Sequence, residues 1–437
     1  MSKISTFTEL RKEGKLPVAL LSTGTFMEYF DLMLYVHMGV LLNELFFDTT
    51  DAKGMALLSA LGVTLTFLCR PIGAVLFGWL GDRYGRKIVL WITTIMMASA
   101  CFVMANLPTY AQIGFTATII ITICRIAQSI SSVGEIISCD LYFVESTNPP
   151  IQYPLSGITD IFGALGGTAA LGVATLVTMD GFNWRWAFWV GCLIGILGFF
   201  IRRALLETKD FSNMVAQINL IQEKFKVSYK EAKKIVENEL KRNQPTKKIL
   251  FALFIIQCVF PLYYYFGYIY CGDLLKSLFN YSSAEVIHNN FILSFACLFT
   301  TIAIYWISYY VNPLKILKIQ LFLSSILVLA LPYLLNNISE PYHLITIQYL
   351  FLILAIHGMP AFAIFYKYIP ILTRFTNTGL MYSFGRMIMF AGTSLGLVYL
   401  VEWWGNWGIF GLFAVTLAAY TIALFYFVKL EKESINS

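Results

Sequence analysis

Apolar runs long enough to cross a lipid bilayer recur along nearly the whole of this 437-residue chain. A helix needs about 20 mostly apolar residues to span the hydrocarbon core. Only 13% of the residues are charged, about half the share of an ordinary soluble domain, and 58% are hydrophobic. We therefore predict an all-α membrane protein with twelve transmembrane helices, at about residues 18–46, 55–80, 88–107, 113–144, 155–178, 185–205, 248–272, 290–311, 315–336, 343–369, 376–401 and 407–428.

Lysine and arginine are distributed unevenly between the segments that join these runs. With the N-terminus inside, the inner segments hold 25 of the 31 Lys and Arg residues, and the outer segments hold three. The positive-inside tendency therefore predicts that both termini are cytoplasmic. The net charge of +6 follows from this topology and gives no reason to expect a nucleic-acid partner. The polar, basic residues 1–17 and the long first run predict no signal peptide.

The longest polar interruption, residues 206–247, divides the apolar runs into six and six. Its apolar residues recur at helical spacing, and Ser228 with Glu231 fits a capping box. We expect short amphipathic helices on the cytoplasmic face, with a solvated linker as the alternative. The predicted organisation is a six-helix bundle at 1–205, this linker, and a second six-helix bundle with a short cytoplasmic tail at 248–437. Transporters built from repeated bundles share this plan.

Residues 70–87 read RPIGAVLFGWLGDRYGRK, so a glycine-rich apolar run ends in a cluster of charges. Small residues let a neighbouring helix approach closely, and Gly85 supplies a permissive backbone for a tight turn. Asp82 lies beside three bases, and we expect its charge to be held in local pairs while one helix end moves against another. A surface loop with chance charges is the alternative that the spacing leaves open.

This stretch resembles the loop motif of the major facilitator superfamily, G-x-L-x-D-R-x-G-R-[RK], at Gly78, Asp82, Arg83, Gly85, Arg86 and Lys87. The upstream segment that begins at Arg70 is similar to the metabolite:proton symporters, which include proline/betaine, α-ketoglutarate and citrate carriers. Segments that begin at Gly24, Arg125 and Asn183 are also similar to that family. The resemblance implies an inner gate in which Glu145 and Glu207 pair with Arg83 and Arg86.

The second half resembles the family less closely. Where the family often repeats the charged loop after the eighth span, residues 306–315 read WISYYVNPLK and lack the acid and the arginine pair. In the fourth span, Ser129 and Val133 stand at positions where the family has glycine. These departures leave open a sensor that keeps the fold without transporting a solute.

Ionisable residues inside the apolar runs need a partner or a purpose, because each costs at least ~2.5–3.5 kcal/mol on insertion scales. Glu28, Asp31 and Tyr35 share one face of the first predicted helix. An acid in a low-dielectric cavity can hold a proton near neutral pH, as proton coupling requires. We therefore take Asp31, Glu135 and Glu28 as candidate proton-coupling residues. Helix pairing with an arginine is the alternative for the acids of the first helix.

Arg125 and Glu135 lie on one predicted helix, about 15 Å apart along its axis. We expect them to serve one aqueous cavity at two depths, with Arg125 as modulator or substrate anchor. Two further acids, Asp140 and Asp160, are interpreted as structural, with a role as proton sites as the alternative. Arg386 either binds a substrate carboxylate or neutralises an acid of the first half, and the sequence favours neither.

Aromatic residues make up 16% of the chain, and residues 263–270 read YYYFGYIY. Tyrosine faces stabilise quaternary ammonium groups by cation–π contact, which suits betaine. An interfacial aromatic belt is the alternative interpretation. The candidate substrate-binding residues are Arg125, Arg386, Tyr35, Tyr264 and Tyr268.

These features predict a secondary active transporter in the bacterial inner membrane that couples a proton to a zwitterionic osmolyte such as proline or betaine, by alternating access. A carrier of organic carboxylates and a non-transporting sensor are the alternatives. An enzyme is least expected, because no P-loop, metal spacing or nucleophile motif occurs. We expect no cofactor or metal. The expected partners are the lipid bilayer, a small-molecule solute and a proton, and the expected functional unit is a monomer.

Overall fold

The computed structural model describes residues 22, 25–31, 33, 34, 42, 45–47, 67–177, 183–202, 207–240, 247–356 and 358–436. This described part is almost entirely helical and has no β-strand. Seven of its helices are long and apolar enough to cross a membrane, and Arg185–Phe200 and Pro341–Ile353 are shorter apolar helices. The prediction of an all-α membrane protein is confirmed.

The first half contributes the helices that carry the charged motif and most buried acids. Its long helices after residue 67 are α4 (Arg70–Tyr84), α5 (Arg86–Asn106), α7 (Phe115–Ser146), α9 (Ile158–Val177) and α10 (Arg185–Arg202), with the short α6 (Tyr110–Ile113) and α8 (Gln152–Ser156) between them. Gly85 separates α4 from α5 with a φ of 99°. Residues other than glycine rarely adopt this φ, so a glycine allows the tight turn.

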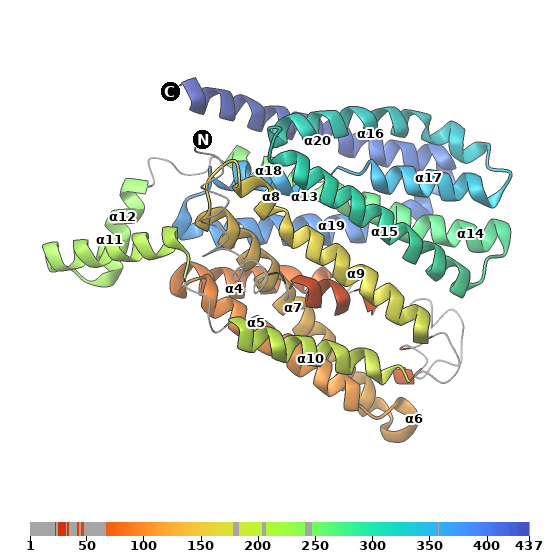
Figure 1. Ribbon diagram of the computed structural model, residues 1–437, viewed down its shortest axis with the longest axis horizontal. Coiled ribbons are helices and arrows are strands. Elements are labelled where there is room, and N and C mark those ends of the chain that lie inside the picture. The colour runs from red at the N-terminus through yellow and green to blue at the C-terminus, as the bar shows by residue number, and fades with distance from the viewer. Residues whose placement is uncertain are drawn as a thin grey trace.

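The second half packs around a large apolar core. Its helices are α13 (Lys247–Tyr264), the π-helix η2 (Tyr265–Tyr270), α14 (Cys271–Phe279), α15 (Ser283–Ser308), α16 (Pro313–Asn336), α17 (Pro341–Ile353), α18 (Met359–Tyr366), α19 (Ile371–Trp404) and α20 (Asn406–Asn436). Figure 1 shows this half, coloured green to blue, beside the orange and yellow helices of the first half.

The predicted helix at 343–369 is two helices, α17 and α18, with a non-helical break between them. Pro360, in the first turn of α18, lacks a backbone donor and cannot continue a helix from α17. The break frees backbone carbonyls, which need partners at membrane depth. Side chains of α16 supply them, because Ser324 donates to the Leu354 carbonyl at 2.7 Å and Gln320 donates to the Ala355 carbonyl at 3.3 Å.

The tyrosine-rich segment forms the π-helical turn η2 directly after α13. Pro261 lies inside α13 and removes one backbone donor just before this turn. Gln348 of α17 donates to the Gly267 carbonyl at 2.8 Å, and Asn290 of α15 donates to the Tyr268 carbonyl at 3.4 Å. Single π-turns occur often at functional sites, and this one carries tyrosines that line a cavity described below.

Between the halves lie two amphipathic helices, α11 (Lys209–Phe225) and α12 (Tyr229–Leu240). The predicted capping box is confirmed: Glu231 N–H donates to the Ser228 hydroxyl at 3.3 Å, and Ser228 N–H donates to the Glu231 carboxylate at 2.9 Å. Phe211, Met214 and Ile218 pack against Val236 of α12. Figure 1 shows both helices protruding beyond one end of the bundle. The ends of the predicted linker, 203–206 and 241–246, lie outside the described residues.

The halves contact each other mainly through two helix pairs, α4 with α19 and α9 with α15. Gly78 of α4 lies so close to α19 that an added Cβ would stand 2.8 Å from the Thr376 Cα. We call the end of the bundle that carries α11, α12 and the α4–α5 turn the basic end. The distribution of Lys and Arg predicts that the basic end faces the cytoplasm.

Candidate functional site

At the basic end, Asp82 links α4 to the start of α19 in the other half. Its carboxylate accepts hydrogen bonds from Phe375 N–H at 3.1 Å, Thr376 N–H at 3.0 Å and the Thr376 hydroxyl at 2.6 Å. The nearest guanidinium nitrogen of Arg86 is 4.0 Å away. The main partners of Asp82 are therefore the backbone and hydroxyl of α19, not the local bases that the sequence suggested.

Glu145, at the C-terminal end of α7, joins both halves through two arginines. It accepts from Arg86 at 2.9 Å and from Arg374 of α19 at 3.3 Å. The Thr208 hydroxyl donates to its second oxygen at 2.9 Å. Arg86 also donates to the Ile371 carbonyl at the start of α19, at 3.3 Å. This cluster, with Asp82, forms a closed contact between the halves, which we call the basic-end cluster.

Glu207 binds the N-terminus of α5 and makes no ion pair with an arginine side chain in the described residues. It accepts from the backbone N–H groups of Arg86 at 3.0 Å and Lys87 at 3.2 Å. A carboxylate there complements the unsatisfied donors of a helix start. The expected pairing of Arg83 with Glu145 or Glu207 is wrong: Arg83 is exposed and lies over the rings of Trp79 and Tyr84.

Deeper in the first half, two acids of the first helix are each paired with an arginine. Asp31 lies 3.4 Å from Arg125 of α7, and Glu28 lies 3.3 Å from Arg70 at the start of α4. All four side chains are buried. Gln128 accepts from Arg125 at 3.0 Å and so helps to hold that guanidinium. Both pairs line one small cavity of about 10 Å³.

Glu135 and Asp140 lie further along α7, away from that cavity. The Thr93 hydroxyl donates to Glu135 at 2.8 Å, and the Thr159 hydroxyl donates to Asp140 at 2.8 Å. Neither acid lines any of the three cavities described here. The predicted sharing of one cavity by Arg125 and Glu135 does not appear, because the acid that Arg125 meets is Asp31.

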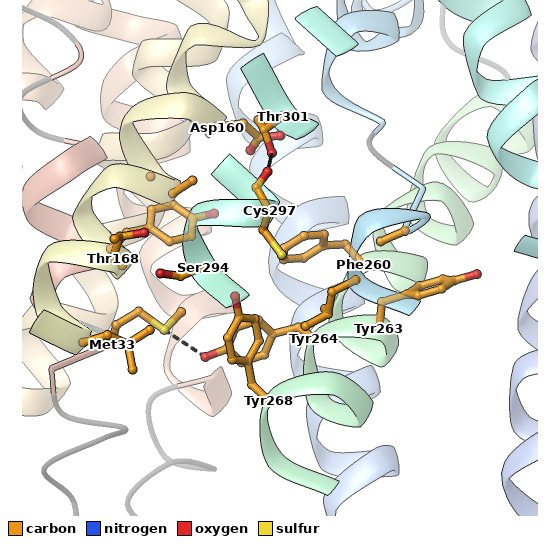
Figure 2. Close-up of a pocket in the computed structure, with 17 residues that line it drawn as sticks. Met33, Asp160, Thr168, Phe260, Tyr263, Tyr264, Tyr268, Ser294, Cys297 and Thr301 are labelled. Carbon is orange, nitrogen blue, oxygen red and sulfur yellow. Dashed lines mark hydrogen bonds between the residues drawn. The ribbon is translucent and has the colours of Figure 1, made fainter. Parts of the chain in front are cut away.

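A larger cavity of about 120 Å³ lies between the halves. Its walls come from the first helix and α9 on one side and from α13, η2, α15 and α17 on the other. Figure 2 shows Asp160 and Thr301 at one end, with Tyr264, Tyr268 and Met33 at the other. The Tyr264 hydroxyl bonds the Met33 sulfur at 2.8 Å, as the dashed line in Figure 2 indicates. We call this the aromatic cavity.

A second cavity of about 30 Å³ adjoins the aromatic cavity and shares the side chains of Tyr29, Met33, Phe260 and Tyr264 with it. Its own walls include Arg70, Tyr382 and Arg386, so we call it the arginine cavity. Tyr382 lies between the two arginines: Arg70 donates to its hydroxyl at 3.0 Å, and the Arg386 guanidinium lies against its ring.

Arg386 is 8% exposed and lies against aromatic rings. Its guanidinium carbon is 4.7 Å from the centre of the Phe260 ring and 5.0 Å from that of Tyr382. Among the residues that the structure describes, no carboxylate lies within ion-pair distance of Arg386, and its Nε has no hydrogen-bond partner. Such a group can receive an anion, because a buried charge needs a counter-charge or strong hydrogen bonds.

Comparison with known proteins identifies the family. The sequence profile of the Major Facilitator Superfamily matches residues 21–397. The chain belongs to this superfamily. It is therefore a multi-pass membrane protein, and the curated relatives that it matches are named as transporters.

Among bacterial relatives, the proline/betaine transporter of Salmonella typhimurium is 32% identical over 234 residues, which cover 50% of this chain and 47% of the relative. The proline/betaine transporter of Escherichia coli is 33% identical over 234 residues, with the same shares. The chain thus spans about half the length of the curated relatives it matches. The proton:xylose symporter XylE of Escherichia coli, solved with 6-bromo-6-deoxy-D-glucose, has the same fold, with a TM-score of 0.74, 13% identity and 94% of each chain covered.

Within this major facilitator protein, the candidate substrate-binding residues separate into three groups. Tyr264 and Tyr268 line the aromatic cavity, Arg386 lines the arginine cavity, and Arg125 is paired with Asp31. Tyr35 lies outside the described residues. No cluster of three or more His, Cys, Asp or Glu side chains in the described residues could hold a metal ion.

The sequence did not single out several residues of these cavities. Tyr29, Phe260 and Tyr382 gave no signal, because aromatic residues are common throughout the chain. Asp160 was interpreted as structural, although it lines the aromatic cavity. For Arg374, the signal is its similarity to the family at the entry to the eleventh span, which does not indicate that it meets Glu145.

Proposed function

We propose that this transporter carries a small zwitterion, such as proline or betaine, together with a proton. The observation that carries the proposal is the pair of adjoining cavities between the halves, one walled by tyrosines and the other holding Arg386. The two cavities share four side chains, so one ligand of the size of an amino acid can reach both. The two enterobacterial relatives are proline/betaine transporters, which supports the same solute class.

The site offers a different kind of side chain to each end of the solute. Arg386 offers a planar fork of donors to a carboxylate, and it lies in a dry environment where such a contact is strong. Arg70 is already neutralised by Glu28, so among the described residues that line the arginine cavity Arg386 is the guanidinium without a carboxylate partner. The faces of Phe260, Tyr264 and Tyr268 suit the positive end by cation–π contact.

Proton coupling is assigned to the pair formed by Asp31 and Arg125. A protonated acid costs little to move through a dry intermediate, whereas an ionised acid needs its partner. Release of Asp31 from Arg125 would therefore accompany protonation, and re-pairing would follow deprotonation. Glu28 with Arg70 is the second such pair, and it touches the arginine cavity through Arg70.

Alternating access would use the basic-end cluster as the inner gate. In this state Asp82, Glu145 and Arg86 hold α19 against the first half. Release of the solute to that side requires these bonds to break. We further propose a functional monomer in the bacterial inner membrane, with both termini and the basic end in the cytoplasm.

The test is uptake of labelled proline, betaine, α-ketoglutarate and citrate by proteoliposomes, with and without an inward proton gradient. We expect gradient-driven accumulation of proline or betaine. The variant Asp31→Asn should lose this accumulation by at least about tenfold but keep exchange of preloaded solute, because exchange needs no net proton movement.

Three outcomes would contradict the proposal. Accumulation of α-ketoglutarate or citrate alone would favour a carboxylate carrier, in which Arg70 and Arg386 together hold a dianion. Full accumulation by Asp31→Asn would move the proton site to another acid. No proton-dependent uptake of any solute by the unmutated protein would favour a sensor.

A further inference from the structure

The acid at one end of the aromatic cavity has no role in the gate or the proton pairs. Asp160 lies in the first turn of α9 and is the carboxylate that lines this cavity. No basic side chain in the described part of the chain lies within ion-pair distance of Asp160. A carboxylate at this depth without a cationic partner is costly unless it has a function.

Asp160 is held from behind by a tyrosine of the other half. The Tyr305 hydroxyl, on α15, donates to Asp160 Oδ2. Tyr305 is fully buried and does not line the cavity, whereas Thr301, one turn earlier on α15, does. The hydrogen bond uses one carboxylate oxygen, so the other is left for a group inside the cavity. Figure 2 shows the Asp160 side chain at the cavity end beside Thr301.

The approach of Tyr305 to α9 depends on a glycine. A Cβ at Gly157 would collide with the Tyr305 ring. This contact brings α15 against the start of α9, and the two helices belong to opposite halves. The position of the Asp160 carboxylate is therefore set by residues of both halves.

We infer that Asp160 is the counter-ion for the positively charged end of the solute, and that Tyr305 positions it only while α9 and α15 are in contact. The inference rests on the proposed function, because it needs a solute with a cationic end. It adds a specificity determinant opposite Arg386: a carboxylate for the ammonium and an arginine for the carboxylate, with aromatic rings between them. When the halves separate at α9 and α15, Asp160 loses its positioning bond and the solute is held less tightly.

The experiment measures dissociation constants by calorimetry on the full chain in lipid nanodiscs. The probes are proline and oxolane-2-carboxylate, in which a ring oxygen replaces the ammonium, together with betaine and 3,3-dimethylbutanoate, in which a carbon replaces the ammonium nitrogen. The unmutated protein should prefer each zwitterion by about tenfold or more over its isostere, which keeps the carboxylate but lacks the positive charge, as expected for a desolvated charge pair. Asp160→Asn should reduce this preference to about threefold or less and should not weaken isostere binding, because the isosteres carry no positive charge for Asp160 to hold.

Tyr305→Phe separates positioning from packing. It keeps the ring against Gly157 and removes the hydroxyl, so it should weaken zwitterion binding by roughly threefold to tenfold and leave the isosteres unaffected. In the Asp160→Asn background the same change should have no further effect, because both residues act as one unit. Asp140→Asn is the matched control. It removes a neighbouring buried acid outside the cavity and should keep the preference.

The inference is overturned if Asp160→Asn keeps the full preference, or if Tyr305→Phe weakens zwitterion and isostere equally. If Asp160→Asn does not fold, the preference for zwitterion over isostere measured for Tyr305→Phe tests the inference by itself. If the unmutated protein transports proline or betaine but these ratios do not change, only this inference fails. If it binds no zwitterion at all, the proposed function fails and this inference fails with it.

Discussion

In the first half, Asp31 and Glu28 are each paired with an arginine of a neighbouring helix, whereas Arg386 in the second half lies between aromatic rings. The paired charges form closed units that need nothing from outside. Arg386 has no carboxylate partner in the described residues and is suited to bind an anionic group reversibly. The same type of side chain therefore serves different purposes in the two halves.

The difference extends to the rest of each half. Buried acids in the described residues are concentrated in the first half, where Glu135 and Asp140 also have hydroxyl partners. The second half instead supplies the aromatic walls, from Phe260 to Tyr268 and from Tyr382 to Phe390. The first half therefore supplies most of the buried acids, and the second half supplies most of the aromatic side chains that line the cavities.

The largest effect is expected from breaking a closed pair. Arg125→Met leaves Asp31 buried without its counter-charge, and loss of one partner of a buried ion pair costs about 3–5 kcal/mol. Thermal unfolding in detergent, followed with a dye that reacts with the buried cysteines as they become exposed, measures this loss. Arg386→Met should cost far less stability, because it leaves no carboxylate unpaired.

The double variant Asp31→Asn with Arg125→Met provides the control for this comparison. It removes both charges, so most of the lost stability should return. Equal unfolding temperatures for Arg125→Met and Arg386→Met would show that the two arginines are alike and would break the comparison between the halves.

Much of the first half could be predicted because charges are rare in an apolar chain. The glycine-rich stretch ending at Asp82 and Lys87, and the face shared by Glu28 and Asp31, stand out against their surroundings. The partners could not be predicted in the same way. Asp82 meets Thr376, almost 300 positions away, and this contact depends on how α4 and α19 cross.

The aromatic residues that line the cavities in the second half could not be predicted from the sequence. With 25 tyrosines and 36 phenylalanines in the chain, an aromatic residue in an apolar run does not reveal whether it faces lipid or a cavity. The break between α17 and α18 and the turn η2 decide which tyrosines line the cavity, and both depend on tertiary hydrogen bonds as well as on Pro360 and Pro261.

A smaller effect is expected where the two halves share charge, in the basic-end cluster. Asp82→Asn keeps the shape but removes the charge that accepts three hydrogen bonds from α19. Because the asparagine carbonyl can still accept, the loss should be about 1–3 kcal/mol, less than for an unpaired buried charge. The open fraction at this end should rise by roughly tenfold for each 1.4 kcal/mol lost. Spin labels at the exposed Tyr84 and Lys315, in a background without the native cysteines, would report longer distances.

Arg83→Gln is the matched change for this measurement, because Arg83 lies in the same turn but is exposed, with its guanidinium over the rings of Trp79 and Tyr84. Its distance distribution should equal that of the unmutated protein. If Asp82→Asn and Arg83→Gln give the same distances, Asp82 does not hold the halves together.

The smallest effect is expected where charge lies in water, at the start of α12 in the segment that joins the halves. Hydrogen bonds from the backbone and hydroxyl of Ser228 hold the pKa of the exposed Glu231 below its usual value. A carboxyl whose pKa is lowered by folding stabilises the folded state above its unfolded pKa, and this contribution is lost as pH falls through the folded pKa. Hydrogen exchange across α12, corrected for intrinsic rates, should therefore speed up between about pH 6 and pH 3.

Ser228→Ala should remove most of this pH dependence and Ser228→Thr should keep it, since threonine also caps a helix. An unchanged pH response in Ser228→Ala would mean that a group outside the capping box controls the fraying of α12.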